Sequence, residues 1–225
     1  LRRFMREEKR VVEGDDLTQL SILTSHPLWL IKMWNKQYGY EVTKQICYDN
    51  QEVPTLARRV HTLKSSKSEL LINKKFREGY LSKDALLYEG GNIADTKEFL
   101  EGLITIQDES SQCVALMVDP KENDRVLDVC AAPGTKTTHM AQLMKNTGEI
   151  IACDIHEHRV ELIYNSIKRM GLNCIHPQQL DGTLAHESFE AESFDRILVD
   201  APCSGYGVLK RKNDIKVHME PTDMD

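Results

Sequence analysis

The chain has 225 residues, of which 40% are hydrophobic and 28% are charged, so it can bury a core and is not wholly disordered. No apolar run approaches the roughly 18 residues of a membrane span, and the first residues lack the apolar core of a signal peptide. These features indicate a soluble, cytoplasmic protein without a membrane partner, and the net charge of −6 argues against a protein coated with nucleic acid.

The first half of the sequence reads as short helices and strands, with an acidic turn over 13–16. The apolar residues of the helix after this turn are expected to form a packing face rather than a binding platform; they are Trp29, Leu30, Met33 and Trp34. In chain order we predict the end of a helix over 1–12, a helix from Ser25 as N-cap to Gly39, a strand over Leu56 to Leu63, an amphipathic helix over Ser66 to Glu78 with its basic side outward, a strand over Ile104 to Ile106, and a helix that Asp108 caps and that ends near Val118.

From residue 124 onward, apolar strands alternate with helices. A strand that is apolar nearly throughout is typical of a parallel sheet covered on both faces, and this alternation is the signature of a doubly wound α/β fold. We predict strands over 125–130, 149–154, 174–180 and 194–200, with helices from about Thr135 to Met144 and from His156 to Met170, where Gly171 ends the second helix.

Basic residues concentrate in the first hundred positions. Residues 1–100 carry 17 Lys and Arg against 14 Asp and Glu, whereas 101–225 carry 12 against 21. The segment from Arg58 to Arg77 holds seven basic residues and one acidic residue. Such a patch either neutralises nucleic-acid phosphates or is a solvated helix face, and charge alone favours neither.

The cysteines and histidines give no indication of a metal centre. Six cysteines are scattered without a C-x-x-C pair, which disfavours zinc and redox sites and indicates reduced thiols. His156 and His158 stand two residues apart at a helix start, where they cannot share a face. We therefore predict no metal site.

Polar or reactive groups follow each of the four predicted parallel strands, at the edge where such sheets bind ligands. The first strand runs into small residues, Gly134 and a helix N-terminus, where backbone N–H groups can approach a ligand closely. The turn is neither G-x-G-x-x-G nor a P-loop, so it suits a nucleoside without pyrophosphate. Asp154 can accept hydrogen bonds from ribose hydroxyls, and Asp181 can hold an exocyclic amine. S-adenosylmethionine is the commonest cofactor of this description.

Two motifs together make the sequence recognisable. The turn over 128–137, Asp-Val-Cys-Ala-Ala-Pro-Gly-Thr-Lys-Thr, and the hexapeptide over 200–205, Asp-Ala-Pro-Cys-Ser-Gly, resemble the Sun/RsmB (Fmu) family of S-adenosylmethionine-dependent RNA cytosine-5 methyltransferases, in particular its bacterial 16S ribosomal RNA branch. The segments 25–30, 106–112, 194–200 and 207–211 resemble it too. The resemblance implies a Rossmann-like methyltransferase sheet, with the cofactor bound by Cys130, Ala131, Ala132, Pro133, Gly134, Thr135, Lys136, Asp154, Asp181 and Asp200.

The expected catalytic residues are Cys203 and Asp200. Cytosine C5 is a poor nucleophile, and a thiolate that adds to C6 makes C5 reactive toward a sulfonium methyl group. The resemblance implies that the nucleophile lies in a later Thr-Cys motif and that Cys203 assists product release. By analogy with DNA cytosine methyltransferases, Cys203 would instead be the nucleophile, so the motif leaves both roles open. Asp200 is expected to orient the cytosine or the methionine end of the cofactor, and Lys136 to hold polar groups near the loop.

The sequence departs from the family pattern at two places. Thr135 stands where relatives usually have glycine, and we expect its side chain to narrow the methionine pocket. No Thr-Cys motif follows Cys203, and only four of the seven strands of a methyltransferase sheet fit before Asp225. Since the chain also starts with Leu1 rather than Met, we expect a fragment of a longer protein, with a sheet incomplete at the C-terminus, that cannot methylate by itself.

The predicted partner is 16S ribosomal RNA, which requires an unstacked cytosine, and a monomer is favoured. The RNA-contacting candidates are Arg58, Arg59, Lys64, Lys210 and Arg211. The expected domains are the tail of a helical, NusB-like domain with a linker over 1–25, a small α+β RNA-positioning domain over 26–105, and the N-terminal part of the methyltransferase domain over 106–225. A transfer RNA cytosine-5 methyltransferase and a non-catalytic RNA-binding assembly factor on the same fold are the alternatives, whereas the missing pyrophosphate loop disfavours a nicotinamide-dependent dehydrogenase.

Overall fold

The computed structural model describes residues 12–54, 56–212, 214–218 and 220–224, which form two compact units. The first unit contains the chain up to Pro54 and the segment from Cys203 onward, and the second runs from Thr55 to Pro202. Residues 26–54 thus group with the helix before them, whereas the expected domain ranges placed them with the residues up to 105. The helix end predicted over 1–12 lies, apart from Val12, outside the described residues.

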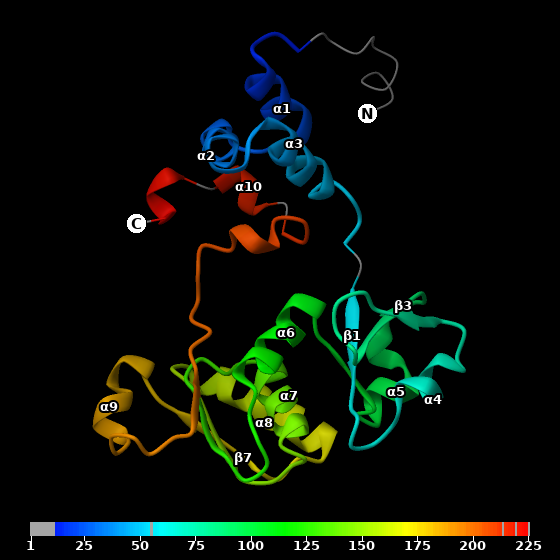
Figure 1. Ribbon diagram of the computed structural model, residues 1–225, viewed down its shortest axis with the longest axis vertical. Helices are drawn as coiled ribbons and strands as arrows, with labels where there is room; N and C mark the ends of the chain where they lie inside the picture. Colours follow the sequence, from blue (N-terminus) through cyan, green and yellow to red (C-terminus); the bar gives the residue numbers. More distant parts are fainter. Residues whose placement is uncertain (1–11, 55, 213, 219, 225) are drawn as a thin grey trace. The chain divides into compact units, whose positions relative to one another are not determined.

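Short helices build the first unit (Figure 1). They are α1 (Asp16–Thr24), α2 (Leu28–Tyr38), α3 (Tyr40–Asp49) and α10 (Ile215–His218). The acidic stretch predicted as a turn over 13–16 leads into α1, because the Asp15 carboxylate accepts the Thr18 N–H at 2.8 Å and caps the helix. The predicted N-cap at Ser25 is wrong: Ser25 ends α1 in the left-handed region with φ 54°, and α2 starts after Pro27.

The core of the first unit joins α2 to the segment that follows Cys203. Leu30 and Leu209 are both buried and pack with Trp29, Met33 and Trp34, which confirms the predicted packing face of this helix. The rings of Trp29 and Tyr206 meet edge to face, with their centroids 5.9 Å apart. The residues after Cys203 are therefore anchored on α2.

An antiparallel sheet of order β2-β3-β1-β4 opens the second unit. Its strands are β1 (Ala57–Val60), β2 (Phe76–Glu78), β3 (Ala85–Tyr88) and β4 (Ile104–Ile106), and its helices are α4 (Lys67–Leu71) and α5 (Lys97–Leu100). The strands predicted over 56–63 and 104–106 are confirmed as β1 and β4. The helix predicted over 66–78 is wrong beyond Leu71. Ser66 and Glu69 form a capping box that starts α4, but Phe76 pairs with Tyr88 in the sheet and is buried there.

A parallel sheet of order β7-β6-β5-β8 forms the rest of the second unit, which confirms the α/β fold. Its strands are β5 (Arg125–Asp128), β6 (Glu149–Asp154), β7 (Ile175–Gln179) and β8 (Arg196–Leu198), and the accompanying helices are α6 (Glu109–Val118), α7 (Thr135–Leu143), α8 (Glu157–Met170) and α9 (Ala185–Ser188). Gly171 ends α8 as predicted, with φ 69°.

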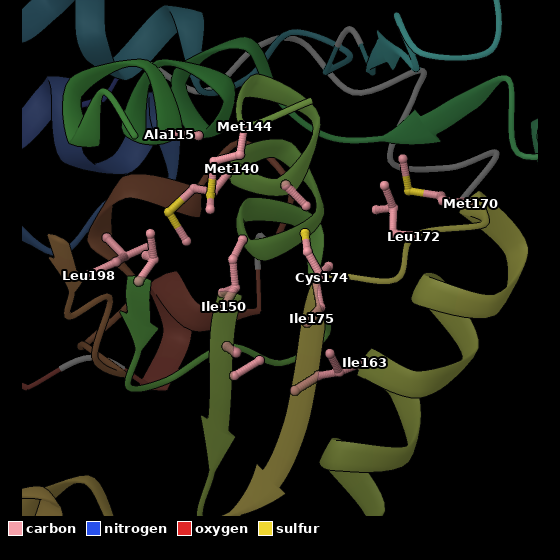
Figure 2. Packing of buried hydrophobic residues seen from close by; sticks show 14 residues of the cluster. Ala115, Met140, Met144, Ile150, Ile163, Met170, Leu172, Cys174, Ile175 and Leu198 are labelled. Atoms are coloured by element: carbon pink, nitrogen blue, oxygen red, sulfur yellow. The ribbon is translucent and has the colours of Figure 1, made fainter. Parts of the chain in front are cut away.

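Apolar side chains cover both faces of this sheet, which is why its strands read as continuous apolar runs. Figure 2 shows one cluster, where Met140 of α7, Met144 directly after that helix and Ile163 of α8 pack near Ile150 of β6 and Ile175 of β7. The opposite face carries a second cluster; its buried members are Leu127, Val129, Ile151 and Cys153. Within the described ranges, no helix is long and apolar enough to cross a bilayer, and no group of three or more metal-ligating side chains is found.

Candidate functional site

A cavity of about 540 Å³ lies at the carboxyl ends of the parallel strands, within the second unit. Three residues predicted for the cofactor site, Cys130, Asp154 and Asp181, line it. Most of the remaining wall is apolar, with Leu127, Val129, Ile155, Leu180, Ile197 and Val199 among its residues. The cavity therefore combines a mostly apolar wall with a few polar groups, as ligand pockets commonly do.

Asp154 ends β6 and is only 2% exposed. Its Oδ1 accepts the His156 N–H at 3.2 Å, and its Oδ2 lies 3.4 Å from Nη1 of Arg159. In the described part of the chain, Oδ2 has no hydrogen-bond partner. The ion pair with Arg159 leaves this buried carboxylate oxygen without a hydrogen bond, and it is therefore suited to accept one from a hydroxyl of a bound ligand.

Asp181 follows β7 and caps a short 3₁₀ turn over Gly182–Leu184. Its Oδ1 accepts the hydroxyl of Thr183 at 2.7 Å and the N–H of the same residue at 3.0 Å, and these bonds lower the pKa of the carboxyl. Gly182 permits a close approach here, because a Cβ at this position would lie 2.3 Å from Cγ1 of Val129 in the cavity wall.

Of the predicted cofactor residues 130–136, residues 130–134 form the loop between β5 and α7, here called the cofactor loop, and Thr135 and Lys136 begin α7. The cofactor loop is held by the neighbouring strand and by α8. Ala131 N–H donates to the carbonyl of Cys153 at 2.7 Å. From α8, Arg159 donates to the carbonyl of Ala132 at 3.3 Å and Ser166 to that of Pro133 at 3.1 Å. The loop contains a cis peptide bond at Ala132–Pro133, and Gly134 caps α7 with φ 95°. Burial raises the pKa of the Cys130 thiol, and the charge of Asp128 adds to this effect.

A second polar cluster surrounds the first turn of α7. Lys136 Nζ lies 2.6 Å from Oδ2 of Asp200, so the structure pairs two residues that the sequence placed in different motifs. Thr137 donates its hydroxyl to Oδ2 of Asp128 at 2.7 Å. Burial raises the pKa of Asp128 to about 6. Sequence reasoning missed Asp128 and Thr137, although an aspartate at the end of an apolar strand was a signal for a bonded carboxylate.

Cys203 is an exposed free cysteine that directly follows Pro202, a residue of the cavity wall. It begins the segment that groups with the first unit. The other five cysteines are free as well, and three of them are buried.

The predicted RNA contacts divide into buried and accessible residues. Arg58 and Arg59 are 3% and 0% exposed, so their prediction as phosphate contacts is wrong: both belong to a strand buried at every position. Lys64 is exposed but donates to the carbonyls of Glu101 and Arg169, at 3.1 and 3.2 Å. In the first unit, Lys210 lies 3.7 Å from a carboxylate oxygen of Glu52, and Arg211 is exposed.

Comparison with known proteins identifies the family of this chain. Residues 115–225 match the family model described as 16S rRNA methyltransferase RsmB/F, and residues 26–73 match the ferredoxin-like domain of RsmF/B-like methyltransferases. The chain is 45% identical over 214 residues to the probable ribosomal RNA small subunit methyltransferase B of Bacillus subtilis (strain 168), covering 93% of this chain and 48% of that protein. It is 33% identical over 222 residues to ribosomal RNA small subunit methyltransferase B of Klebsiella pneumoniae, covering 96% of this chain and 50% of that protein.

The crystal structure of a methyltransferase homolog protein from Pyrococcus horikoshii is also similar, with 30% sequence identity and a TM-score of 0.77 over 94% of this chain and 68% of that one. The chain belongs to the RsmB/F family of methyltransferases, as its two motifs predict. It spans about half the length of the curated relatives it matches.

Proposed function

We propose that this chain contributes the cofactor site of an S-adenosylmethionine-dependent enzyme that methylates C5 of a cytosine in 16S ribosomal RNA. The observation that carries the proposal is the buried Oδ2 of Asp154, which lacks a hydrogen-bond partner within the described chain and belongs to the wall of a cavity of about 540 Å³. Family membership and the names of the relatives support the same reaction class.

The residues present fit this cofactor. Asp154 would accept the ribose hydroxyls, and Asp181 would hold the exocyclic amine of adenine. Leu127, Val129 and Ile197 provide apolar surface for a purine ring. Lys136 and Asp200 form an ion pair at 2.6 Å. The pair places one cation and one anion side by side, where they can bind the polar groups of a methionine moiety or a cytosine. When bound, the cofactor supplies an electrophilic methyl group.

Cys203 is the proposed catalytic cysteine. In one role its thiolate adds to C6 of cytosine, C5 then bonds to the methyl group that the cofactor would supply, and removal of the C5 proton by a base expels the thiolate again. In the other role Cys203 assists that release while a different cysteine forms the covalent bond. Its exposure leaves the sulfur accessible to a substrate. The domain ranges 1–25, 26–105 and 106–225 remain part of this proposal, with the middle range positioning the RNA.

Cofactor binding is the first test. Isothermal titration with S-adenosylmethionine should give saturable binding to the wild-type protein, and D154N should weaken it by about tenfold or more, since a hydrogen bond to a charged group is lost. D95N is the matched control, because Asp95 is an exposed aspartate of the antiparallel half. Absence of binding by the wild type, or equal affinities of D154N and D95N, would overturn the proposed cofactor site.

The substrate is tested with the full-length protein. An RNA carrying 5-fluorocytosine should trap a covalent adduct. Its C5 carries a fluorine in place of the proton that must be removed before the cysteine can leave, so the bond between the cysteine and C6 persists. If Cys203 assists release, C203S should still trap an adduct with ordinary 16S RNA, whereas C203S should abolish trapping if Cys203 is the nucleophile. Modification of transfer RNA but not of 16S RNA would show that the proposed substrate is wrong. Absence of any adduct would refute the cysteine mechanism.

A further inference from the structure

The arginine at position 59 lies on β1 of the antiparallel sheet, yet its side chain reaches the parallel half of the same unit. The guanidinium is fully buried. Its Nη1 donates to the side-chain oxygen of Gln107 and, at 2.8 Å, to the carbonyl of Thr135, and its Nη2 lies 3.1 Å from the hydroxyl of Thr138. Two of these three acceptors belong to the first turn of α7.

That same turn carries the polar contacts of the candidate site. Lys136 lies next to Thr135 and forms the ion pair with Asp200, and Thr137 bonds to Asp128. The loop over 130–134 leads directly into this turn. A shift of the first turn of α7 would therefore move the loop and both contacts together.

A buried arginine at this position needs a reason. Burial lowers the pKa of Arg59 to about 9, and the charge of Arg169 lowers it further, while Asp84 acts in the opposite sense. A cation at the N-terminal end of a helix also faces the unfavourable end of the helix dipole. A protein with an apolar side chain of similar volume at such a position is often as stable as one with a buried ion. An apolar residue could not replace the planar guanidinium of Arg59, which donates to three acceptors at fixed angles.

We propose that Arg59 is a positioning residue that holds the first turn of α7, and with it the cofactor loop, in the geometry that binds the ligand. The antiparallel sheet then acts as a rigid support of the cofactor site. This inference rests on the proposed function for the identity of the ligand, but not for the mechanical coupling of Arg59 to α7.

Arg169 provides a matched control. It is a partly buried arginine of α8 that also joins the two halves of the unit, and it donates to the carbonyls of Phe99 and Ile104, each at 2.9 Å, and to the hydroxyl of Thr105 at 3.1 Å. None of these acceptors belongs to the cofactor loop. R169K should therefore lower the melting temperature without changing ligand affinity, whereas R59K should weaken S-adenosylmethionine binding roughly tenfold.

Two further measurements keep the test sharp. T138V removes one acceptor of Arg59 with little change of shape, so it should weaken binding in the same direction as R59K and by a smaller factor. Hydrogen exchange in the ligand-free protein should be faster in R59K than in R169K at the amide of Thr138, which donates to the carbonyl of Gly134 at 2.9 Å.

The outcomes separate the two proposals. If the wild type does not bind S-adenosylmethionine, the proposed function fails, and the exchange rates at Thr138 still decide whether Arg59 supports α7. If the wild type binds, then equal affinities of R59K and the wild type overturn the inference. Equal loss of affinity in R59K and R169K also overturns it, because it would reflect general destabilisation.

Discussion

Replacing Asp128 by asparagine should make the stability of the protein less dependent on pH. Asp128 is 1% exposed at the end of β5, and burial raises the pKa of its carboxyl from 3.8 to about 6. The charge of Asp200 adds to this shift, while the hydrogen bond from Thr137 and the charge of Lys136 oppose it. The folded chain therefore binds this proton about a hundredfold more tightly than the unfolded chain, which corresponds to about 3 kcal/mol.

The sign follows from which form the fold favours. The neutral acid is favoured, so its contribution to stability is complete below pH 3.8 and is lost as the pH rises through about 6. D128N keeps an oxygen that accepts the Thr137 hydroxyl but cannot ionise. Between about pH 4 and about pH 8, the free energy of unfolding of D128N should therefore rise relative to wild type by about 2–3 kcal/mol.

Urea unfolding followed by far-UV circular dichroism at a series of pH values measures this difference. D95N serves as the control for a lost surface charge. A difference between D128N and wild type that stays constant from about pH 4 to about pH 8 would refute the argument from burial.

Two substitutions test the packing around the site and in the first unit. G182A should lower the melting temperature by several degrees and weaken ligand binding, because its new Cβ would lie 2.3 Å from Cγ1 of Val129. Differential scanning calorimetry measures the first effect and titration the second. In the control G91A nothing lies within 4 Å of the new Cβ, so neither the melting temperature nor the affinity should change. L209A should cost about 2–5 kcal/mol of stability and shift the tryptophan emission to the red, because Leu209 is 1% exposed and packs with Trp29; an unshifted spectrum with unchanged stability would contradict this packing.

The parallel half of the fold was predictable because its signals are local. The strand predicted over 149–154 coincides with β6, since an uninterrupted apolar run bounded by Gly148 and Asp154 has few other interpretations. The end of α8 was equally clear, because Gly171 adopts the left-handed conformation that ends helices.

The antiparallel half was less predictable because its pairing is not local. Ser66 and Glu69 correctly signal the start of a helix, but nothing in the segment 66–78 reveals that Phe76 pairs with Tyr88. No strand is predicted from the sequence at β3 either, although its first three residues are buried in the sheet. Tertiary pairing decided these elements against local helical preference.

The candidate site was predictable where a residue follows a strand. Cys130, Asp154 and Asp181 meet at one cavity because the carboxyl ends of parallel strands share an edge. The partners of these residues were not predictable, since the contacts that hold the α7 turn come from distant positions. Arg59 and Thr135 are 76 residues apart in the chain.

The basic segment shows why charge counts fail to identify a phosphate-binding surface. His61 donates to the carbonyl of Met170 at 3.0 Å, and Lys64 donates to the carbonyl of Arg169, so both cap the C-terminal end of α8. The last carbonyls of a helix lack intrahelical partners and carry partial negative charge, which makes them natural acceptors for such groups. A cation that satisfies a helix end and one that binds RNA look alike in the sequence. They differ only in whether the fold brings a carbonyl within reach, and here the side chains of Arg59 and Lys64 both donate to one.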